Sequence, residues 1–323
     1  MAKTFPYIEA HGSHREIGRA IGTSFKERIA NWISERKQNI PSYDILLAKN
    51  DPYLRAANLQ FPQFIDELTG IAEGAGVDFM DYFFLNNEEL NNDNCTIAVS
   101  YGESGAIIGH NEDSLAKLID HLYILKATVG DTTLLGLQDM MTLPGVSATM
   151  NSWGLVQCIN SLHHMPHVGV PRTFLSRAIL ECRSLNEAET LIRSTNSASG
   201  YNHVLVQEGE IRNIEVSGNH VGIKSIQSKP FVHTNHFLAK EMEQFETQRS
   251  KSSVARLKRA SELVRPNMTI EDMESLLRDT ENSDYPICQP DATIGSVVFI
   301  LNQRRMYVCY SHPCQGEYHE YTL

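Results

Sequence analysis

The sequence lacks the features of several large protein classes. Its 323 residues include 28 Lys and Arg against 39 Asp and Glu, a formal net charge of -11. This acidic excess argues against binding to nucleic acid or anionic lipid, both of which reward clustered basic side chains. The N-terminus has no apolar core typical of a signal peptide, and no apolar run reaches the 18 or so residues of a membrane helix. We therefore expect a cytoplasmic protein with neither nucleic acid nor membrane among its partners.

The six cysteines also lack the spacing of a disulfide framework or a zinc site. They are scattered through a long chain without any CxxC motif, so free thiols in a reducing compartment are expected. One histidine-rich motif lies between His163 and His167, but Met165-Pro166 interrupts any helix that could align metal ligands. The chain contains no phosphate-binding glycine loop or dinucleotide fingerprint. The sequence therefore predicts neither a metal nor a cofactor.

No Pro-, Gly- or Ser-rich linker, internal repeat or low-complexity tract divides the chain. Its 41% hydrophobic content can supply a sizeable core. We therefore predict a single domain over residues 1–323. Within it, residues 1–94 are expected to be mainly helical, whereas residues 95–323 alternate between strands and helices.

Hydrophobic periodicity predicts the individual elements. Apolar side chains recur every four residues from Ile17 to Ile33 and predict one long amphipathic helix. Further helices are predicted over 61–73, 79–90, 174–182, 185–192, 248–264 and 269–277. Their predicted caps are Asp78, Ser184 in a capping box with Glu187, and Thr269 with Asp272. Strands are predicted over 96–100, 106–109, 121–129, 132–137, 154–160, 202–207, 211–216, 221–226, 294–301 and 306–310. The strands at 121–129 and 132–137 flank Gly130-Asp131 and are predicted to form a hairpin. This order suits helices packed on antiparallel sheets.

The most informative stretch covers residues 94–114, where two short strands flank a Gly-Glu-Ser-Gly turn at 102–105. A three-residue loop in this hairpin would place Cys95 opposite Asp113, whereas a two-residue loop would place it opposite Glu112. Either register brings a carboxylate beside Cys95. An ordinary thiol has a pKa of about 8.5 and is mostly protonated at neutral pH, so it needs a nearby base to act as a nucleophile.

Cleavage of the Asn94-Cys95 bond would supply a base from Cys95 itself. Its new α-amine would have a pKa of about 7.7 to 8.0, suited to taking the proton from its own thiol. The polar run at 91–94 favours an exposed loop in which a self-cleaving bond could lie. The alternative is that Cys95 is a buried strand cysteine and Asp113 a turn residue, because buried thiols are common.

The Cys95-Thr96 pair and the Gly-His-Asn-Glu-Asp motif at 109–113 resemble the start of the mature chain in the isopenicillin N acyltransferase family of N-terminal nucleophile hydrolases. The resemblance extends to motifs at 17–22, 67–74, 151–155, 233–236 and 292–294. It implies an α+β fold, a four-layer αββα sandwich with two antiparallel sheets between helical layers. It also implies cleavage between Asn94 and Cys95 into segments 1–94 and 95–323, which stay associated as a noncovalent heterodimer.

The same resemblance implies the site residues. Cys95 would be the nucleophile and Asp113 would hold its amine. Asn235 is the candidate oxyanion donor, because a side-chain amide can stabilise the developing negative charge by about 2.7 to 4 kcal/mol. Thr96 and Asn111 are candidate supporting residues. Related enzymes also use an arginine, but the corresponding segment at 289–293 contains none.

We therefore expect an autoproteolytically activated cysteine enzyme that cleaves or transfers acyl groups of small N-acyl amides, peptides or acyl thioesters. Water as the acceptor would make it a hydrolase, and an amine would make it an acyltransferase. The alternative is an unprocessed or catalytically idle relative that only binds a small ligand. The identities of the acyl group and amine, and the assembly of copies into a homo-oligomer, stay open.

Overall fold

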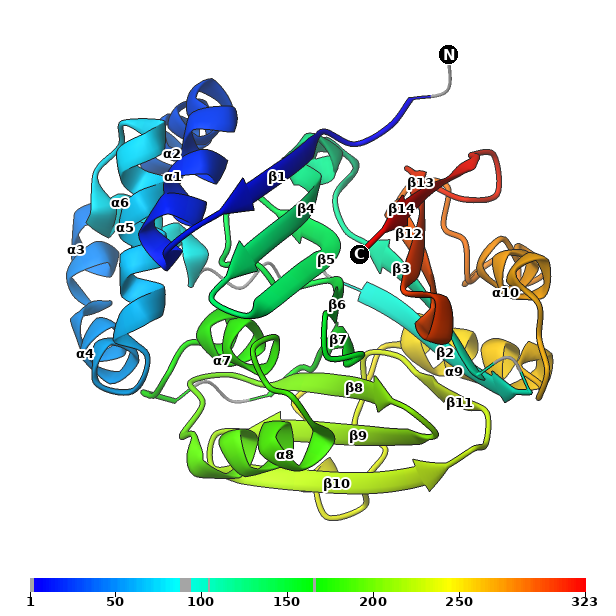
Figure 1. Cartoon of the computed structure of the whole chain (residues 1–323). Helices are drawn as coiled ribbons and strands as arrows, with labels where there is room; N and C mark the ends of the chain where they lie inside the picture. Colours follow the sequence, from blue (N-terminus) through cyan, green and yellow to red (C-terminus); the bar gives the residue numbers. More distant parts are fainter. Residues whose placement is uncertain (1–2, 88–93, 104, 165–166) are drawn as a thin grey trace.

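The computed structural model describes residues 3–87, 94–103, 105–164 and 167–323 (Figure 1). These residues form two sheets with helices on the outer face of each. The strand orders are β1-β4-β5-β6-β7-β8-β9-β10 and β11-β2-β3-β12-β13-β14. Neighbouring strands run antiparallel, except that β1 runs parallel to β4. The αββα sandwich is therefore confirmed, with one parallel pair at the edge of the larger sheet.

The elements have the following bounds. The α-helices are α1 His14–Ser24, α2 Lys26–Asn39, α3 Tyr43–Ala48, α4 Asp51–Gln60, α5 Pro62–Ala75, α6 Phe79–Asn86, α7 Arg172–Ile179, α8 Leu185–Ser194, α9 Lys251–Leu263 and α10 Ile270–Leu277, and the 3-10 helices are η1 Ala116–His121, η2 Glu243–Phe245 and η3 Leu301–Gln303. The strands are β1 Tyr7–His11, β2 Asn94–Gly102, β3 Gly105–Asp113, β4 Leu122–Val129, β5 Thr132–Asp139, β6 Ala148–Asn151, β7 Val156–Ser161, β8 Tyr201–Gln207, β9 Glu210–Ser217, β10 His220–Gln227, β11 Phe231–His233, β12 Thr293–Ile300, β13 Arg305–Tyr310 and β14 Tyr318–Thr322.

The first segment is mainly helical, as predicted, but the long helix expected between Ile17 and Ile33 is wrong at its middle. Phe25 has φ -115° and ψ 19°, so α1 ends and α2 begins on either side of it. The apolar stripe is nevertheless buried on both helices. A period-four pattern identifies the inward face, whereas the break depends on the backbone of one residue.

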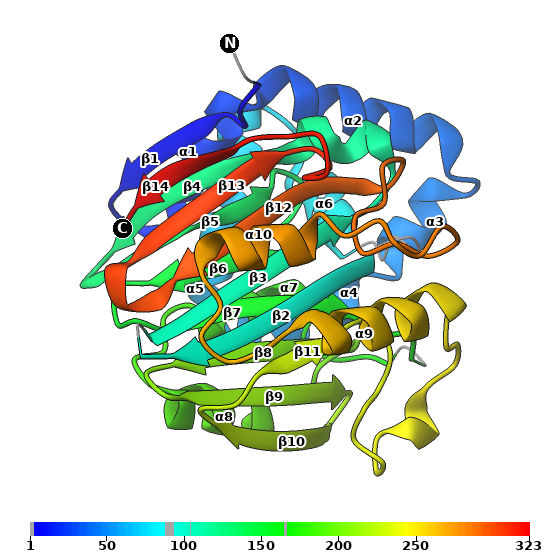
Figure 2. The same cartoon turned by 90° about the vertical axis from the view of Figure 1, so that its right-hand side faces the viewer.

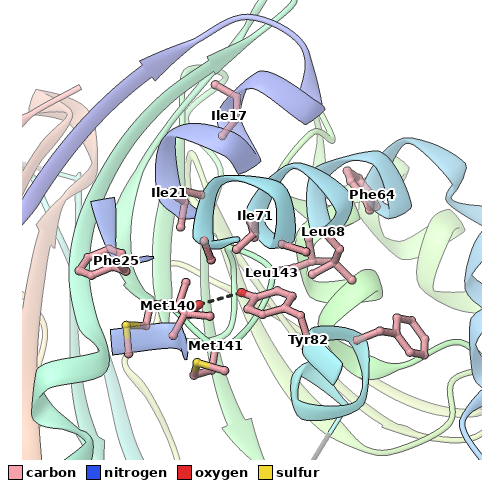
Figure 3. Close-up of a cluster of buried hydrophobic side chains, with 14 of the residues drawn as sticks. Ile17, Ile21, Phe25, Phe64, Leu68, Ile71, Tyr82, Met140, Met141 and Leu143 are labelled. Atoms are coloured by element: carbon pink, nitrogen blue, oxygen red, sulfur yellow. Dashed lines mark hydrogen bonds between the residues drawn. The ribbon is translucent and has the colours of Figure 1, made fainter. Parts of the chain in front are cut away.

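Helices α1 and α5 pack unusually closely over the larger sheet (Figure 3). Ile17 and Ile21 of α1 face Leu68 and Ile71 of α5 within one buried cluster. A Cβ placed on Gly18 would lie 2.0 Å from the backbone oxygen of Glu67, so only glycine permits this approach. Helices α1 and α5 are thereby held in direct backbone contact with each other.

Helix α6 is connected to the segment that follows β5. Tyr82 Oη donates a hydrogen bond of 2.7 Å to the backbone oxygen of Met140 (Figure 3). The predicted cap is confirmed at the start of this helix, where the Asp78 carboxylate accepts from the N–H groups of Met80 and Asp81. The hydrogen bond from Tyr82 to Met140 holds the chain just after the end of β5, which lies beside the cavity described below.

Two further hydrophobic layers complete the sandwich. One lies between the sheets and includes Ile97 of β2, Leu137 of β5 and Val297 of β12. The other lies between the smaller sheet and helices α9 and α10, which cover its outer face (Figure 2). Side chains on β2 and β3 therefore alternate between the inter-sheet layer and the helical layer.

The remaining caps are confirmed in part. Thr269 and Asp272 form the predicted capping box of α10. At α8, Ser184 Oγ accepts from the Glu187 N–H, but the Glu187 carboxylate accepts from the Arg183 N–H instead of closing the box. One predicted half of that box is therefore wrong.

The predicted strands are present, but the sheets also contain short strands that the sequence did not reveal. These are β1, β6, β11 and β14. Several sequence predictions also fall on residues outside the described ranges: the end of the helix at 79–90, the polar run at 91–93, Ser104 in the hairpin turn, and residues 165–166 in the histidine motif. Among the described residues, no helix is both long and apolar enough to cross a bilayer.

Candidate active site

The hairpin of β2 and β3 places Cys95 at the mouth of the inter-sheet layer. Cys95 pairs with Glu112 and Asn94 with Asp113, which is the register of a two-residue loop. The three-residue register, which placed Cys95 opposite Asp113, is wrong. Because alternate residues face opposite sides of a sheet, Cys95 and Glu112 point one way and Thr96 and Asp113 the other.

Glu112 contacts the candidate nucleophile directly. Cys95 Sγ donates to Glu112 Oε1 at 3.5 Å, and His110 Nε2 lies 3.1 Å from Glu112 Oε2. His110 is fully buried, and the Glu112 side chain is only 12% exposed. The carboxylate is thus held between a thiol and an imidazole, all three on the same face of the hairpin.

The backbone of Cys95 is held as closely as its side chain. Its N–H donates to Asn235 Oδ1 at 2.9 Å, just beyond β11. Its carbonyl oxygen accepts from Arg256 Nη1 at 2.7 Å and from Asn160 Nδ2 at 3.2 Å. These bonds hold the peptide group at the predicted cleavage site through its N–H, and the next peptide group through its carbonyl oxygen.

Arg256 is the main site residue that the sequence did not reveal. It lies on α9, which packs against β2 and β11 (Figure 2), and its side chain is fully buried. Besides the Cys95 carbonyl, its guanidinium donates to Thr96 Oγ1 at 2.8 Å and to Asn235 Oδ1 at 2.9 Å. The site therefore contains a buried arginine, although none lies at 289–293.

A signal for Arg256 was present in the sequence. Ser253, Arg256 and Ala260 share the inward face of α9, where two small residues flank one long basic side chain. An arginine on such a face must find buried partners, because a buried unpaired charge is costly. Two of those partners, Cys95 and Thr96, lie about 160 residues away in the sequence.

Asp113 lies on the helical side of the hairpin. Its carboxylate accepts from Thr293 Oγ1 at 2.6 Å and from Gln289 Nε2 at 2.8 Å, and it lies 3.9 Å from Arg256 Nη1. Burial raises the pKa of Asp113 to about 6, although Arg256 and Thr293 oppose the shift. In the intact chain the residue that holds the Cys95 nitrogen is Asn235, and Asp113 contacts the guanidinium instead.

The other predicted residues lie at or near this network. Asn235 Nδ2 donates to the Ser161 backbone oxygen at 3.2 Å, so its carbonyl oxygen faces Cys95, and its role as an oxyanion donor stays a prediction. Asn111 Nδ2 donates to the backbone oxygens of Leu277 and Ile287, which ties the end of α10 to β3. Asn111 therefore supports the helical side of the hairpin.

A cavity of about 80 Å³ opens beside Cys95 and Glu112. Its wall includes Trp32 from the first segment and Tyr201 from β8. Arg172 also lines it, with its guanidinium 4.2 Å from the centre of the Tyr201 ring. The cavity therefore combines the candidate thiol with residues from both sides of the predicted cleavage point.

A second carboxylate, Asp139 at the end of β5, lines the same cavity. Burial raises the pKa of Asp139 to about 7, even though it accepts a 2.7 Å hydrogen bond from the Met141 N–H. His121 Nδ1 lies 3.9 Å away, but burial lowers the pKa of this imidazole to about 4, so it is neutral near pH 7. At neutral pH His121 therefore carries no positive charge that could stabilise an ionised Asp139.

The donor atoms of Cys95, His110 and Glu112 lie within 4.8 Å of one another, which is also a spacing that a divalent ion could bridge. The direct thiol–carboxylate and imidazole–carboxylate contacts already account for this grouping. The arrangement can place a proton acceptor beside a sulfur nucleophile without any ion.

Comparisons with known proteins identify a family and a similar protein of known activity. Residues 100–315 match the family model described as acyl-coenzyme A:6-aminopenicillanic acid acyl-transferase. The chain is 23% identical over 367 residues to the beta-alanyl-dopamine/carcinine hydrolase of Drosophila melanogaster, covering 97% of this chain and 95% of the relative.

Two solved structures of variants of the conjugated bile acid hydrolase from Clostridium perfringens also resemble the chain. One matches with a TM-score of 0.43 and 10% identity over 71% of this chain and 97% of that one. The other matches with a TM-score of 0.40 and 11% identity over 74% and 92% of the two chains.

Proposed function

Because this chain belongs to the acyl-coenzyme A:6-aminopenicillanic acid acyl-transferase family, which makes it an amidohydrolase or an acyltransferase, we propose that it acts through a Cys95 acyl-enzyme after self-cleavage. The observation that carries the proposal is the position of Cys95. Its thiol faces the cavity beside Glu112, while both backbone groups of the residue are fixed by Asn235 and Arg256. A small N-acyl amide entering the cavity would meet this sulfur.

Maturation would cut the Asn94-Cys95 bond and leave segments 1–94 and 95–323 associated as a noncovalent heterodimer. The packing of the first segment supports this. Strand β1 pairs with β4, and the apolar faces of α1 and α5 share one buried cluster with residues of that strand. Burial of apolar surface stabilises the association of two cleaved chains in the same way that it stabilises the fold of one intact chain.

In the cleaved enzyme, the α-amine of Cys95 would take the thiol proton, since its pKa of about 7.7 to 8.0 suits that transfer near neutral pH. Asn235 Oδ1 lies where it would accept an N–H from that amine. Arg256 would hold Asn235 and the Cys95 carbonyl in place, with Asp113 supporting the guanidinium. The thiolate then attacks the substrate carbonyl, the Cys95 α-ammonium gives its proton to the departing amine of the substrate, and an acyl-enzyme forms.

The cavity suggests the substrate class. A volume of about 80 Å³ suits a short acyl group. The carboxylates of Glu112 and Asp139 in its wall would attract a positive charge, opposed by the guanidinium of Arg172 in the same wall. The Drosophila relative is named for β-alanyl-dopamine and carcinine, whose acyl group carries a primary ammonium. We therefore propose short amino-acyl amides as substrates, with water as the acceptor in the hydrolytic reaction.

The test compares β-alanyl-dopamine with N-propionyl-dopamine, which has nearly the same shape but no ammonium. The wild-type protein should release dopamine from the β-alanyl amide at least about 10-fold faster, because a charge-assisted hydrogen bond contributes about 1.5–3 kcal/mol. Cys95→Ala should release none. A cleaved wild-type protein that hydrolyses no amide contradicts the proposal, and an intact chain that only binds these compounds supports the ligand-binding alternative.

A further inference from the structure

The base proposed for turnover does not exist before self-cleavage. In the intact chain the Cys95 nitrogen is part of a peptide bond, whose lone pair is delocalised into the carbonyl. That nitrogen donates its hydrogen to Asn235 Oδ1 and cannot accept a proton from the thiol. The first cut therefore requires a different proton acceptor within reach of Cys95 Sγ.

Glu112 meets the geometric requirement. It is the cross-strand partner of Cys95, and its Oε1 already accepts the thiol hydrogen at 3.5 Å. Its other oxygen lies 3.1 Å from His110 Nε2. An ionised carboxylate can only accept hydrogen bonds, so His110 Nε2 must carry the hydrogen that it donates to Glu112. Within the described residues His110 Nδ1 is buried without a hydrogen-bond partner, so no other contact requires the hydrogen on that nitrogen. Glu112 is thus fixed in the position of a base.

The other nearby titratable groups are less suited to this step. Asp113 lies on the opposite face of the hairpin, and its oxygens accept from Thr293 and Gln289. His110 Nε2 faces the carboxylate and carries its hydrogen, so that nitrogen has no lone pair to offer. His110 is therefore a positioning residue for Glu112.

We propose that Glu112 is the general base and then the general acid of self-cleavage, an inference that rests on the proposed function. The carboxylate takes the Sγ proton as sulfur bonds to the Asn94 carbonyl carbon. The bond from that carbon to the Cys95 nitrogen then breaks, and the Glu112 carboxyl returns the proton to the departing nitrogen. Water hydrolyses the thioester, which regenerates the thiol and leaves a carboxylate on Asn94. After that, the free α-amine of Cys95 serves as the base for turnover.

The test follows self-cleavage of the full chain in a cell-free translation reaction, sampled over time by denaturing mass spectrometry. Wild type, Glu112→Gln, Glu112→Asp and the uncleavable Cys95→Ala chain are compared. Glu103→Gln, at the exposed end of the same hairpin, is the matched control and should cleave at the wild-type rate. Glu112→Gln should cleave at least about 100-fold more slowly, and Glu112→Asp should fall between them.

Two additions separate a catalytic role from a folding defect. Formate added to Glu112→Ala should restore part of the cleavage, because a small carboxylate can occupy the space left by the side chain. Hydroxylamine, which cleaves thioesters, should not accelerate Glu112→Gln, because the thioester does not form without the base. Acceleration by hydroxylamine would place Glu112 after the acyl shift and overturn the inference.

The outcomes also separate this inference from the proposed function. A split wild-type chain together with an equally fast Glu112→Gln overturns the role of Glu112 and leaves the enzyme assignment in place. A wild-type chain that stays intact overturns both.

Discussion

Replacing Arg256 with methionine should destabilise the fold strongly, because the guanidinium is the only charge that the structure, across its described ranges, places within 4 Å of the Asp113 carboxylate. Methionine keeps much of the apolar stem and removes the charge. The Cys95 carbonyl and Asn235 Oδ1 would each lose a donor, and a buried carboxylate would lose its counterion. Removing one partner of a buried pair typically costs about 3–5 kcal/mol.

The loss of unfolding free energy caused by Arg256→Met should increase with pH. Because the folded pKa of Asp113, about 6, exceeds its ordinary value of 3.8, its contribution to stability is full below pH 3.8 and is lost as pH rises through about 6. Arg256 lowers this pKa, so its removal raises the folded value further. Arg256→Met should therefore cost more free energy of unfolding at pH 8 than at pH 5, and adding Asp113→Asn should recover part of the loss.

Urea unfolding in the Cys95→Ala background measures this effect on a single uncleaved chain. With an m-value of about 3 kcal/mol/M, the midpoint at pH 8 should fall by about 1 M or more. Arg259→Met is the matched control, since Arg259 lies on the same helix and its ion pair with Asp279 is partly exposed. A loss below about 1 kcal/mol, or an equal loss at pH 5 and pH 8, would refute the reasoning.

Three further predictions concern packing, substrate affinity and the hydrogen bond to the Cys95 nitrogen. Gly18→Ala should lower the free energy of unfolding by about 1–3 kcal/mol in urea titrations, because its Cβ would lie 2.0 Å from the Glu67 oxygen; unchanged stability would contradict the close packing of α1 and α5. Asp139→Asn should raise the KM for β-alanyl-dopamine about 10-fold and leave N-propionyl-dopamine unaffected. In wild type that KM should fall as pH rises through about 7, because only the ionised Asp139 attracts the ammonium; a flat profile would exclude this contact. If Asn235 also donates to the oxyanion, Asn235→Ala should slow dopamine release about 10²- to 10³-fold, and an unchanged kcat would remove Asn235 from the site.

The sequence predicted the fold where local patterns decide it. The caps at Asp78 and Thr269 and the hairpin around Gly130-Asp131 were correct, because each depends on neighbouring residues. Strand β1 was missed because it pairs in parallel with β4, more than 100 residues away, and carries no local pairing signal. The break at Phe25 was missed because both helices share one apolar stripe.

The same contrast between local patterns and contacts that are distant in sequence applies to the candidate site. Family resemblance brought together Cys95, Thr96 and Asn235, which the structure joins through Arg256. The role of Asp113 in holding the Cys95 amine came from the resemblance and stays a prediction. Its position opposite Cys95 depended on a hairpin register that two loop lengths allowed, and one residue of slip moves a side chain to the other face. Glu112 thereby took the place beside the thiol. The burial of Arg256 could be expected from its place on α9, but its contacts with Cys95 and Thr96 could not, because about 160 residues separate them in the sequence.

The most direct test of the account is a denaturing mass spectrum of freshly purified wild-type protein beside Cys95→Ala. Cleavage at Asn94-Cys95 divides 36.3 kDa into chains of roughly 10.6 and 25.7 kDa, with a free cysteine at the start of the larger one. The account predicts these two chains for the wild type and one intact chain for the variant. A single intact chain in both samples, or the same two chains in both, would contradict self-cleavage by Cys95.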